Sequence, residues 1–282
     1  GSNDHRQVAR DAVRMSMVLM KNESNVLPLK KEEKITIVGS GANNLGMQNG
    51  GWTVEWQGKT RPDLEILDQN GNGTINSKEV ASYFKGIYEA KYDAGSASSF
   101  FNNMDKNSDG SVNKDEFERY ERSSSYQPSG TSILEGIMEA TDGKGSVTYD
   151  PRADNLSKDG VVIAVIGEYP YAEGYGDSPT IGLNSFDEAV LERCYESGNQ
   201  VIVIILSGRP LVIKDHVDRW NGFIAAWLPG MAGEGVSDVL FGDFSPTGKL
   251  SFSWPRGTGQ LPLNEGDQDY NPLFPFGHGL SY

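Results

Sequence analysis

Three continuous apolar runs constrain the fold of this chain more than any other feature. They are VVIAVIG at 161–167, VIVIIL at 201–206 and FIAAWL at 223–228. Such runs are typical of strands that are covered on both faces, as in parallel sheets. A shorter run, ITIVG at 35–39, has the same character and leads into a glycine-rich turn at 40–46.

Helical patterns alternate with these strands. An N-terminal helix over 4–20 would place Val8, Ala12, Met15 and Leu19 on one stripe. Alternation of strand and helix predicts an α/β fold, a mainly parallel sheet sandwiched by helices. In such folds the loops after the carboxyl ends of the strands carry function. Those loops are 39–52, 167–179, 206–210 and 228–234, and the other helical candidates are 131–141, 184–197 and 232–241.

Two twelve-residue stretches, 68–79 and 105–116, follow the EF-hand pattern. Each has oxygen-bearing side chains at positions 1, 3, 5 and 9, glycine at 6, a β-branched residue at 8 and glutamate at 12. The pattern predicts two Ca²⁺ sites. The predicted ligands are Asp68, Asn70, Asn72, the Thr74 carbonyl, Asn76 through a water molecule and Glu79 in the first loop, and Asp105, Asn107, Asp109, the Ser111 carbonyl, Asn113 and Glu116 in the second.

Apolar residues flank both loops at helical spacing, as a pair of helix–loop–helix units requires. The alternative is two turns rich in Asn, Asp and Gly that bind nothing. The chain enters this region after Gly58 and leaves it in a polar stretch at 123–130, and both boundaries are rich in turn residues. We therefore expect an all-helical EF-hand pair at 61–126, called the inserted unit below, within an α/β domain formed by 3–60 and 127–282.

The loop GEYPYAEGYGD at 167–177 is the richest in potential chemistry. It holds Glu168, Glu173 and Asp177 among aromatic residues and glycines. A carboxylate beside an aromatic face can have a raised pKa, which suits a proton donor, and the same mixture suits sugars. The alternative is an acidic surface loop. In the stretch 50–58, we expect Trp52 to line a cleft and Trp56 to belong to the core.

Other features narrow the function by exclusion. A formal net charge of −14 argues against nucleic-acid binding. The glycine-rich turn at 40–46 lacks the Lys-Ser/Thr of a phosphate-binding loop. Arg209 in SGRPL suits either an anion clamp or a structural ion pair. No apolar run reaches transmembrane length. The single Cys194 excludes an internal disulfide, and Gly1-Ser2 is typical of an expression remnant, so a missing signal peptide says nothing about location.

Six ordered blocks resemble the second domain of glycoside hydrolase family 3, in its exo-acting β-glucosidases and β-glucan glucohydrolases. The blocks are VARDAVRMSMVLMKNESNVLPL (8–29), GGWTVEWQG (50–58), GEYPYAEGYGD (167–177), LSGRPL (206–211), AAWLPGMAGEGVSDVLFGDFSPTGKLSFSWPR (225–256) and PLFPFGHGLSY (272–282). The resemblance covers nearly all of the chain outside the inserted unit and resumes with TSILEGI at 131–137.

The resemblance implies a retaining glycosidase that acts on a β-glucoside or β-glucan oligosaccharide and is periplasmic or secreted. It implies an upstream (β/α)₈ barrel with the nucleophilic Asp, so that this chain alone is nearly inactive. By similarity, Glu173 is expected to be the acid/base, with Glu168 as the alternative, and Trp52 to clamp the leaving sugar. Two other readings stay open: a calcium-dependent binding or interaction module without catalytic role, and a nucleotide-binding α/β domain.

Overall fold

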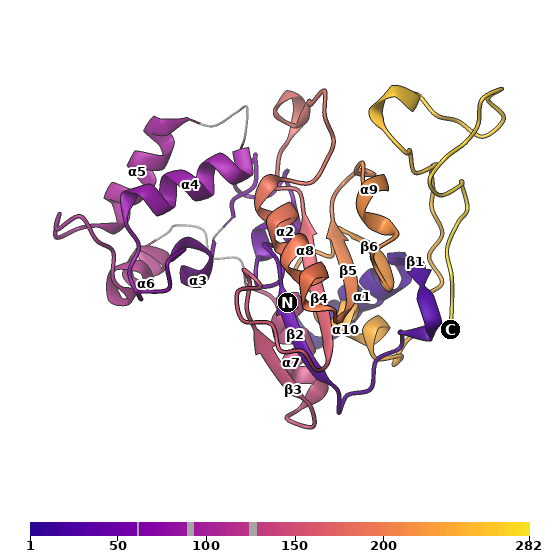
Figure 1. Ribbon diagram of the computed structural model, residues 1–282, viewed down its shortest axis with the longest axis horizontal. Coiled ribbons are helices and arrows are strands. Elements are labelled where there is room, and N and C mark those ends of the chain that lie inside the picture. Colours follow the sequence, from indigo (N-terminus) through magenta and orange to yellow (C-terminus); the bar gives the residue numbers. More distant parts are fainter. Residues whose placement is uncertain (61, 89–92, 124–128) are drawn as a thin grey trace.

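A six-stranded sheet forms the centre of the molecule, which is a computed structural model that describes residues 1–60, 62–88, 93–123 and 129–282 (Figure 1). The strand order is β1-β6-β5-β4-β2-β3. All neighbouring strands run parallel except β1, which is antiparallel to β6. The predicted α/β class with a mainly parallel sheet is confirmed. The bounds are β1 Val18–Asn22, β2 Lys34–Val38, β3 Ser146–Tyr149, β4 Val161–Gly167, β5 Gln200–Leu206 and β6 Gly222–Trp227.

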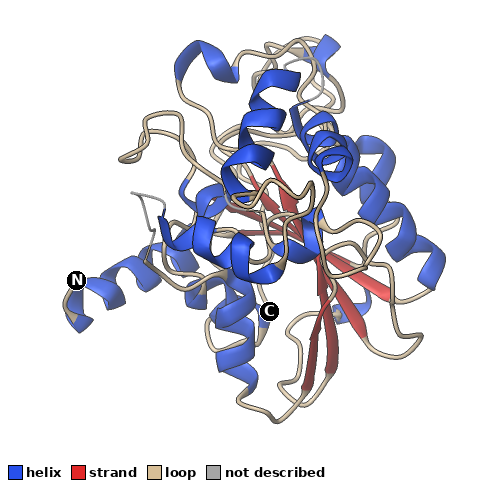
Figure 2. Ribbon diagram, turned by 90° about the vertical axis from the view of Figure 1, so that its left-hand side faces the viewer, coloured by secondary structure: helices blue, strands red, loops and turns tan. Residues whose placement is uncertain are grey.

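Helices cover both faces of this sheet (Figure 2). On one face, side chains of α1, α7 and α10 pack with the strands, and on the other face those of α8 and α9 do. Successive residues of β4 and β5 alternate between the two apolar clusters, which is why these strands are continuously apolar. The bounds are α1 Asn3–Ser16, α2 Leu45–Asn49, α7 Ile133–Thr141, α8 Ser185–Ser197, α9 Lys214–Val217 and α10 Glu234–Leu240, with short 3₁₀ turns at Glu23–Asn25, Glu173–Gly176 and Thr258–Gln260.

The N-terminal prediction was partly wrong. The helix ends at Ser16, and the next residues form β1 rather than a further helical turn. Val18 packs into one apolar cluster and Leu19 into the other, which is the alternation of a strand with two covered faces. The predicted apolar stripe also fails, because Val8 and Met15 are exposed and Val13 is the buried residue of the helix.

Asp187, at the start of α8, ties the ends of two strands together. Its side chain is fully buried and accepts hydrogen bonds from the backbone N–H of Ser40 and Gly167 and from the Ser40 hydroxyl. The Asn184 side-chain amide donates to it at 2.8 Å. Burial raises the pKa of Asp187 to about 6. This carboxyl group fixes the carboxyl end of β4, where the loop with the candidate catalytic residues begins.

The described part of the inserted unit lies beside the sheet, where Figure 1 shows its helices as a separate group. These helices surround a third apolar cluster, which includes Leu67, Val80, Phe101, Met104 and Phe117. The two loops join back to back, because the N–H groups of Ile75 and Val112 each donate to the other residue's carbonyl. The bounds are α3 Leu64–Leu67, α4 Ser77–Tyr88, α5 Ala94–Met104 and α6 Lys114–Ser123.

The short helix α2 holds the chain where it enters the unit and where it leaves. A side chain at Gly46 would lie 2.0 Å from the Lys59 carbonyl oxygen, so only glycine allows this approach of the outgoing chain. On the return side, the Gln48 amide donates to the Thr131 carbonyl at 3.3 Å and its oxygen accepts from the N–H of Ile133 at 3.0 Å. The chain thus contacts the same helix at both junctions, where it enters the inserted unit and where it leaves.

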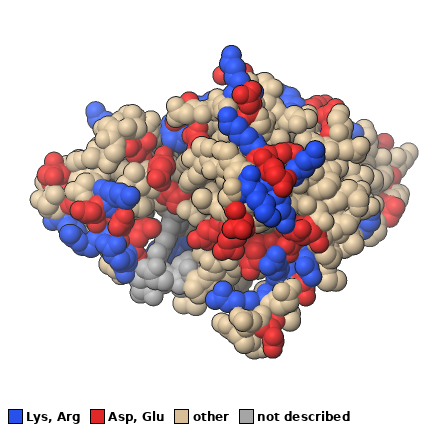
Figure 3. All heavy atoms as spheres, turned by 90° about the horizontal axis from the view of Figure 1, so that it is seen from below, with Lys and Arg blue, Asp and Glu red and all other residues tan. Residues whose placement is uncertain are grey.

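Charges are mixed over the surface. On the face shown in Figure 3, Lys and Arg side chains lie among Asp and Glu side chains, and the net charge of −14 does not gather in a single patch there. Within the described ranges, none of the helices is both long and apolar enough to cross a membrane.

Candidate functional site

The loop after β4, residues 168–184 and called the β4 loop below, carries both candidate carboxylates. Glu168 is mostly buried, with 15% of its side chain exposed, and is heavily bonded. It accepts hydrogen bonds from the Ser207 hydroxyl at 2.6 Å and the Tyr171 hydroxyl at 3.0 Å. Burial and the Glu168 charge raise the pKa of Tyr171 to about 12, so this phenol remains a donor. Glu168 is therefore the centre of a hydrogen-bonded network.

Arg209 completes that network. Its Nε donates to Glu168 Oε1 at 2.9 Å, and its Nη2 donates to the same oxygen. Nη1 donates to the Gly176 carbonyl at 2.8 Å, and the guanidinium lies 4.7 Å from the centre of the Tyr171 ring. Of the two readings that the sequence left open for Arg209, the geometry matches the structural ion pair. Arg209, which follows β5, thus contacts the β4 loop at its start and near its middle.

Glu173 lies in a different environment. It is exposed and opens a short 3₁₀ turn with a positive φ of 50°. The preceding Ala172 is buried, and its N–H donates to the Gln57 side chain at 2.8 Å. The contact of Ala172 therefore holds the backbone directly before Glu173, whose carboxylate is open to solvent.

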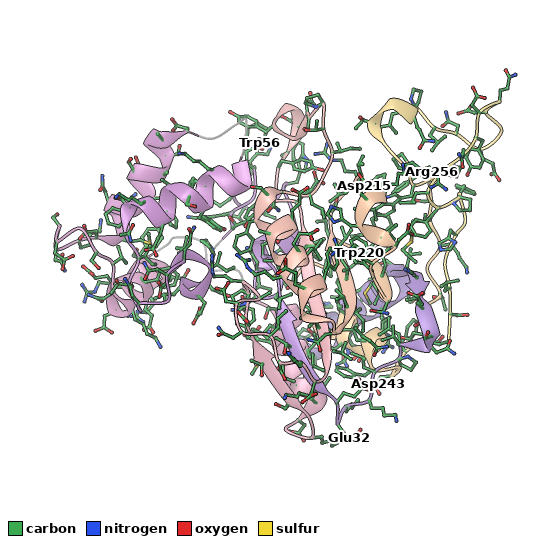
Figure 4. The ribbon with its side chains drawn as sticks, in the orientation of Figure 1. Glu32, Trp56, Asp215, Trp220, Asp243 and Arg256 are labelled. Atoms are coloured by element: carbon green, nitrogen blue, oxygen red, sulfur yellow. The ribbon has the colours of Figure 1, made fainter. Side chains whose placement is uncertain are left out.

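The stretch 50–58 packs directly against the β4 loop. A side chain at Gly51 would lie 2.0 Å from the Tyr171 carbonyl oxygen, which explains the glycine at this contact. Trp52 is 67% exposed, and its ring centroid lies 6.2 Å from that of Trp56. The prediction that Trp56 belongs to the core is wrong, because 49% of it is exposed. Figure 4 labels Trp56 in the upper part of the molecule and Glu32 at its lower edge.

The two predicted calcium loops have similar backbones. Gly73 and Gly110, at position 6 of each loop, have φ values of 82° and 85° and supply the sharp bend. Their N–H groups donate to the carboxylates of Asp68 and Asp105, at 2.7 and 3.0 Å. The side chains at positions 1 and 12 of both loops are largely buried, with exposed fractions of 6–8%.

The glutamate at position 12 folds back over each loop. Glu79 accepts from the N–H groups of Asn70 and Asn76, and Glu116 accepts from the N–H of Asn113 at 3.2 Å. In the part of the chain that the structure describes, no three His, Cys, Asp or Glu side chains gather closely enough to hold a metal ion. Most of the predicted ligands are amide and carbonyl oxygens, so the donor set suits a hard cation such as Ca²⁺ rather than a transition metal.

The inserted unit touches the β4 loop through Tyr169. The Tyr169 and Tyr83 hydroxyls are 3.0 Å apart, and their rings meet edge to face with centroids 6.4 Å apart. Ser185, at the start of α8, donates its hydroxyl to the Gly86 carbonyl at 3.1 Å. Sequence reasoning missed the contact of Tyr169 and did not name Glu168 as the partner of Arg209, because both contacts join residues far apart in the chain.

A family model supplies the decisive comparison. The glycosyl hydrolase family 3 C-terminal domain matches residues 17–282. The chain is a member of glycosyl hydrolase family 3. This family 3 domain is 29% identical to the periplasmic beta-glucosidase of Salmonella typhimurium over 99% of the chain and 35% of that protein. It is 26% identical to a beta-xylosidase of Formosa agariphila over 100% of the chain and 34% of that protein.

Solved structures agree with the family. The exo-1,3/1,4-beta-glucanase ExoP of a Pseudoalteromonas species superposes with a TM-score of 0.72 at 33% identity, over 100% of this chain and 29% of that chain. A beta-glucosidase of Listeria innocua shares the fold with a TM-score of 0.64 at 23% identity, over 100% of this chain and 34% of that chain. The family 3 domain thus spans about a third of the length of the curated relatives described above.

Proposed function

We propose that this domain supplies the acid/base carboxylate and one wall of the sugar pocket of a retaining, exo-acting β-glucosidase or β-glucan glucohydrolase. The observation that carries the proposal is the difference in environment between the two candidate carboxylates of the β4 loop. Glu168 is paired with Arg209 and two hydroxyl groups, whereas Glu173 is exposed next to the stretch with Trp52. A proton donor must reach the leaving oxygen, and the exposure of Glu173 supports its assignment over Glu168.

The nucleophile would come from an upstream (β/α)₈ barrel of the same protein. Retention requires a second carboxylate about 5–5.5 Å from the acid/base. Two observations support a missing partner domain: the chain spans about a third of its relatives, and large apolar side chains are exposed. Among them are Trp52, Val54, Trp56, Leu228 and Met231.

The substrate class and the location follow from the relatives by analogy. Beta-glucosidases, a beta-xylosidase and an exo-1,3/1,4-beta-glucanase are among them, and one is named periplasmic. The proposed substrate is a β-glucoside or β-glucan oligosaccharide, and the proposed location is periplasmic or secreted. Exposed aromatic rings beside acidic groups suit sugars, whose C–H faces stack on rings while their hydroxyls need acceptors.

The stereochemical outcome tests this function. We expect the complete protein, with the region upstream of this chain, to release β-glucose first from an aryl β-glucoside, because two displacements retain the configuration. Proton NMR of the anomeric signal during the first minutes measures this. The matched control is the 282-residue chain alone, which should leave the substrate intact. First release of α-glucose would rule out the retaining mechanism.

We also propose that the inserted unit is an EF-hand pair that binds two Ca²⁺ ions. The loop bends at Gly73 and Gly110, the buried carboxylates at positions 1 and 12, and the paired backbones of Ile75 and Val112 support this. A hard cation bound among these carboxylates would offset their mutual repulsion. We favour this combination of a calcium-binding unit and a hydrolase domain over a calcium-dependent module without catalytic role. The reason is that the β4 loop carries Glu168 and Glu173, the two candidate catalytic carboxylates.

The second loop should bind calcium more tightly than the first. Its ligands include three carboxylates, Asp105, Asp109 and Glu116, whereas the first loop has two, Asp68 and Glu79, and ligand charge raises affinity. Calorimetry on the 282-residue chain with Glu79→Gln or Glu116→Gln measures the order. Glu118→Gln, on an exposed glutamate of α6, is the matched control and should leave both sites intact. Loss of the tighter site in Glu79→Gln would reverse the ranking.

A further inference from the structure

A groove of about 1040 Å³ runs between the inserted unit and the β4 loop. Helices α4, α5 and α6 contribute one wall, and residues 167–184 contribute the other. Binding sites for small molecules usually have about 300–1,000 Å³. This groove is at the upper end of that range, so it has room for an oligosaccharide rather than for a single small ring.

The wall from the inserted unit is a row of aromatic rings. Phe84, Phe100 and Tyr120 are partly exposed and line the groove. Tyr83 also borders it but is buried in the core of the inserted unit, and Tyr169 continues the row on the β4 loop. Consecutive ring centroids are 6.4, 6.0, 5.3 and 5.5 Å apart from Tyr169 to Tyr120. Extended aromatic surfaces are suited to the C–H faces of sugar rings.

Polar groups also line the groove. Asp93 and Ser96 of the α5 end and Glu188 of α8 line it and are exposed. Carboxylates accept hydrogen bonds from sugar hydroxyls, and hydroxyl groups both donate and accept. A lining of rings and acidic groups with little exposed positive charge disfavours an anionic ligand such as a phosphate.

The groove reaches the chain neighbours of Glu173, although Glu173 itself does not line it. Tyr171, Tyr175 and Asp177, which flank Glu173 in the chain, line it together with Gly58 of the Trp52 stretch. A substrate whose terminal glucose is held beside Glu173 would therefore extend its remaining sugars along this groove. We propose that the inserted unit forms a binding site for the leaving portion of a β-linked gluco-oligosaccharide, beyond the sugar next to Trp52. The proposal rests on the proposed function and names the part of the substrate that this unit selects.

A substitution that fills the groove tests the proposal. Ser96→Trp places a bulky side chain in the groove, and Ser99→Trp adds the same bulk to an exposed position of α5 that does not line it. Calorimetry on the 282-residue chain with a β-1,3- or β-1,4-linked glucose tetrasaccharide measures binding directly. We expect Ser96→Trp to weaken binding about tenfold and Ser99→Trp to change it less than about twofold.

Kinetics of the complete protein provide the second measurement. With Ser96→Trp we expect KM for the tetrasaccharide to rise about tenfold, while kcat/KM for an aryl β-glucoside stays within about twofold. Phe100→Leu, which keeps an apolar side chain but removes a stacking ring, should shift KM in the same direction. Its thermal unfolding curve shows whether the inserted unit remains folded.

The outcomes separate this proposal from the proposed function. Equal tetrasaccharide binding by the Ser96→Trp and Ser99→Trp chains would overturn the groove assignment, and so would a loss of aryl glucoside turnover that is confined to Ser96→Trp. If the complete wild-type protein hydrolyses no β-glucoside, the proposed function fails, and the calorimetric comparison on the chain still decides whether the groove holds sugar.

Discussion

Glu173→Ala in the complete protein should lower kcat/KM for β-glucosides with poor leaving groups by about 10²–10⁴-fold, the usual contribution of a general acid or base. Activated aryl glucosides should lose far less in the glycosylation step, because their leaving oxygen needs little protonation. Added azide should partly restore turnover, because a small anion can attack the covalent intermediate without a general base. Rates across a series of aryl leaving groups, with and without azide, measure all three effects.

The matched comparison is Glu168→Ala, which alters the other carboxylate of the same loop. Its loss should be similar for good and poor leaving groups and insensitive to azide, because Glu168 holds the loop through Arg209 and Ser207 rather than by transferring a proton. Leaving-group dependence and azide rescue in Glu168→Ala, and their absence in Glu173→Ala, would move the assignment to Glu168.

Arg209→Met should have the second large effect. It leaves the mostly buried Glu168 carboxylate without its cation, and removal of one partner of a buried pair costs about 3–5 kcal/mol. The side chains of Arg209 and Glu168 are 28% and 15% exposed, so we expect a somewhat smaller loss of unfolding free energy, roughly 2–3 kcal/mol. Denaturant unfolding of the 282-residue chain measures the loss.

The same substitution should reduce activity of the complete protein by about 10²-fold, because a small displacement of a catalytic group has an effect of this size. Arg209 bonds to both Glu168 and the Gly176 carbonyl, so its loss frees the segment that carries Glu173. Combining Arg209→Met with Glu168→Gln should destabilise the chain less than the sum of the two single changes. Strict additivity would show that the pair does not act as a unit.

An exposed ion pair serves as the control for this experiment. Arg122 contacts Glu118 one turn away on α6 at 3.2 Å, and their side chains are 69% and 44% exposed. Arg122→Met should therefore change the unfolding free energy by less than about 1 kcal/mol. It should also leave the kinetics unchanged, because this pair lies away from the β4 loop.

Composition and spacing predicted the central strands well. The runs at 161–167 and 201–206 are apolar on both faces, which leaves little choice but a covered strand. The strand β3, Ser146–Tyr149, was missed because it is short, half-exposed and carries no apolar run. The strand β1 was read as helix because three apolar residues at the end of a helical pattern fit either period.

The candidate site could be located but not resolved from the sequence. Glu168 and Glu173 both follow a buried strand among aromatic residues, so local pattern gives them equal standing. Their environments differ because Arg209, 41 residues beyond Glu168 in the chain, forms an ion pair with Glu168. Tyr83 and Tyr169 are in contact although 86 residues separate them in the chain. Such a contact cannot be predicted from periodicity, which indicates that one face of an element is buried but not which element packs against it.

The meeting of both junctions of the inserted unit on α2 has a consequence for how such a protein can change. Asp63, just inside the unit, accepts hydrogen bonds from Asn43 and Tyr149 of the α/β domain. The start of the inserted unit is therefore bonded directly to the α/β domain. An element whose ends lie close together can be gained, lost or exchanged without rearranging the strands around it. The proposed calcium sites and the inserted unit's wall of the proposed oligosaccharide groove would therefore be gained or lost together, and a different small domain grafted between the same two junctions would also lie beside the β4 loop.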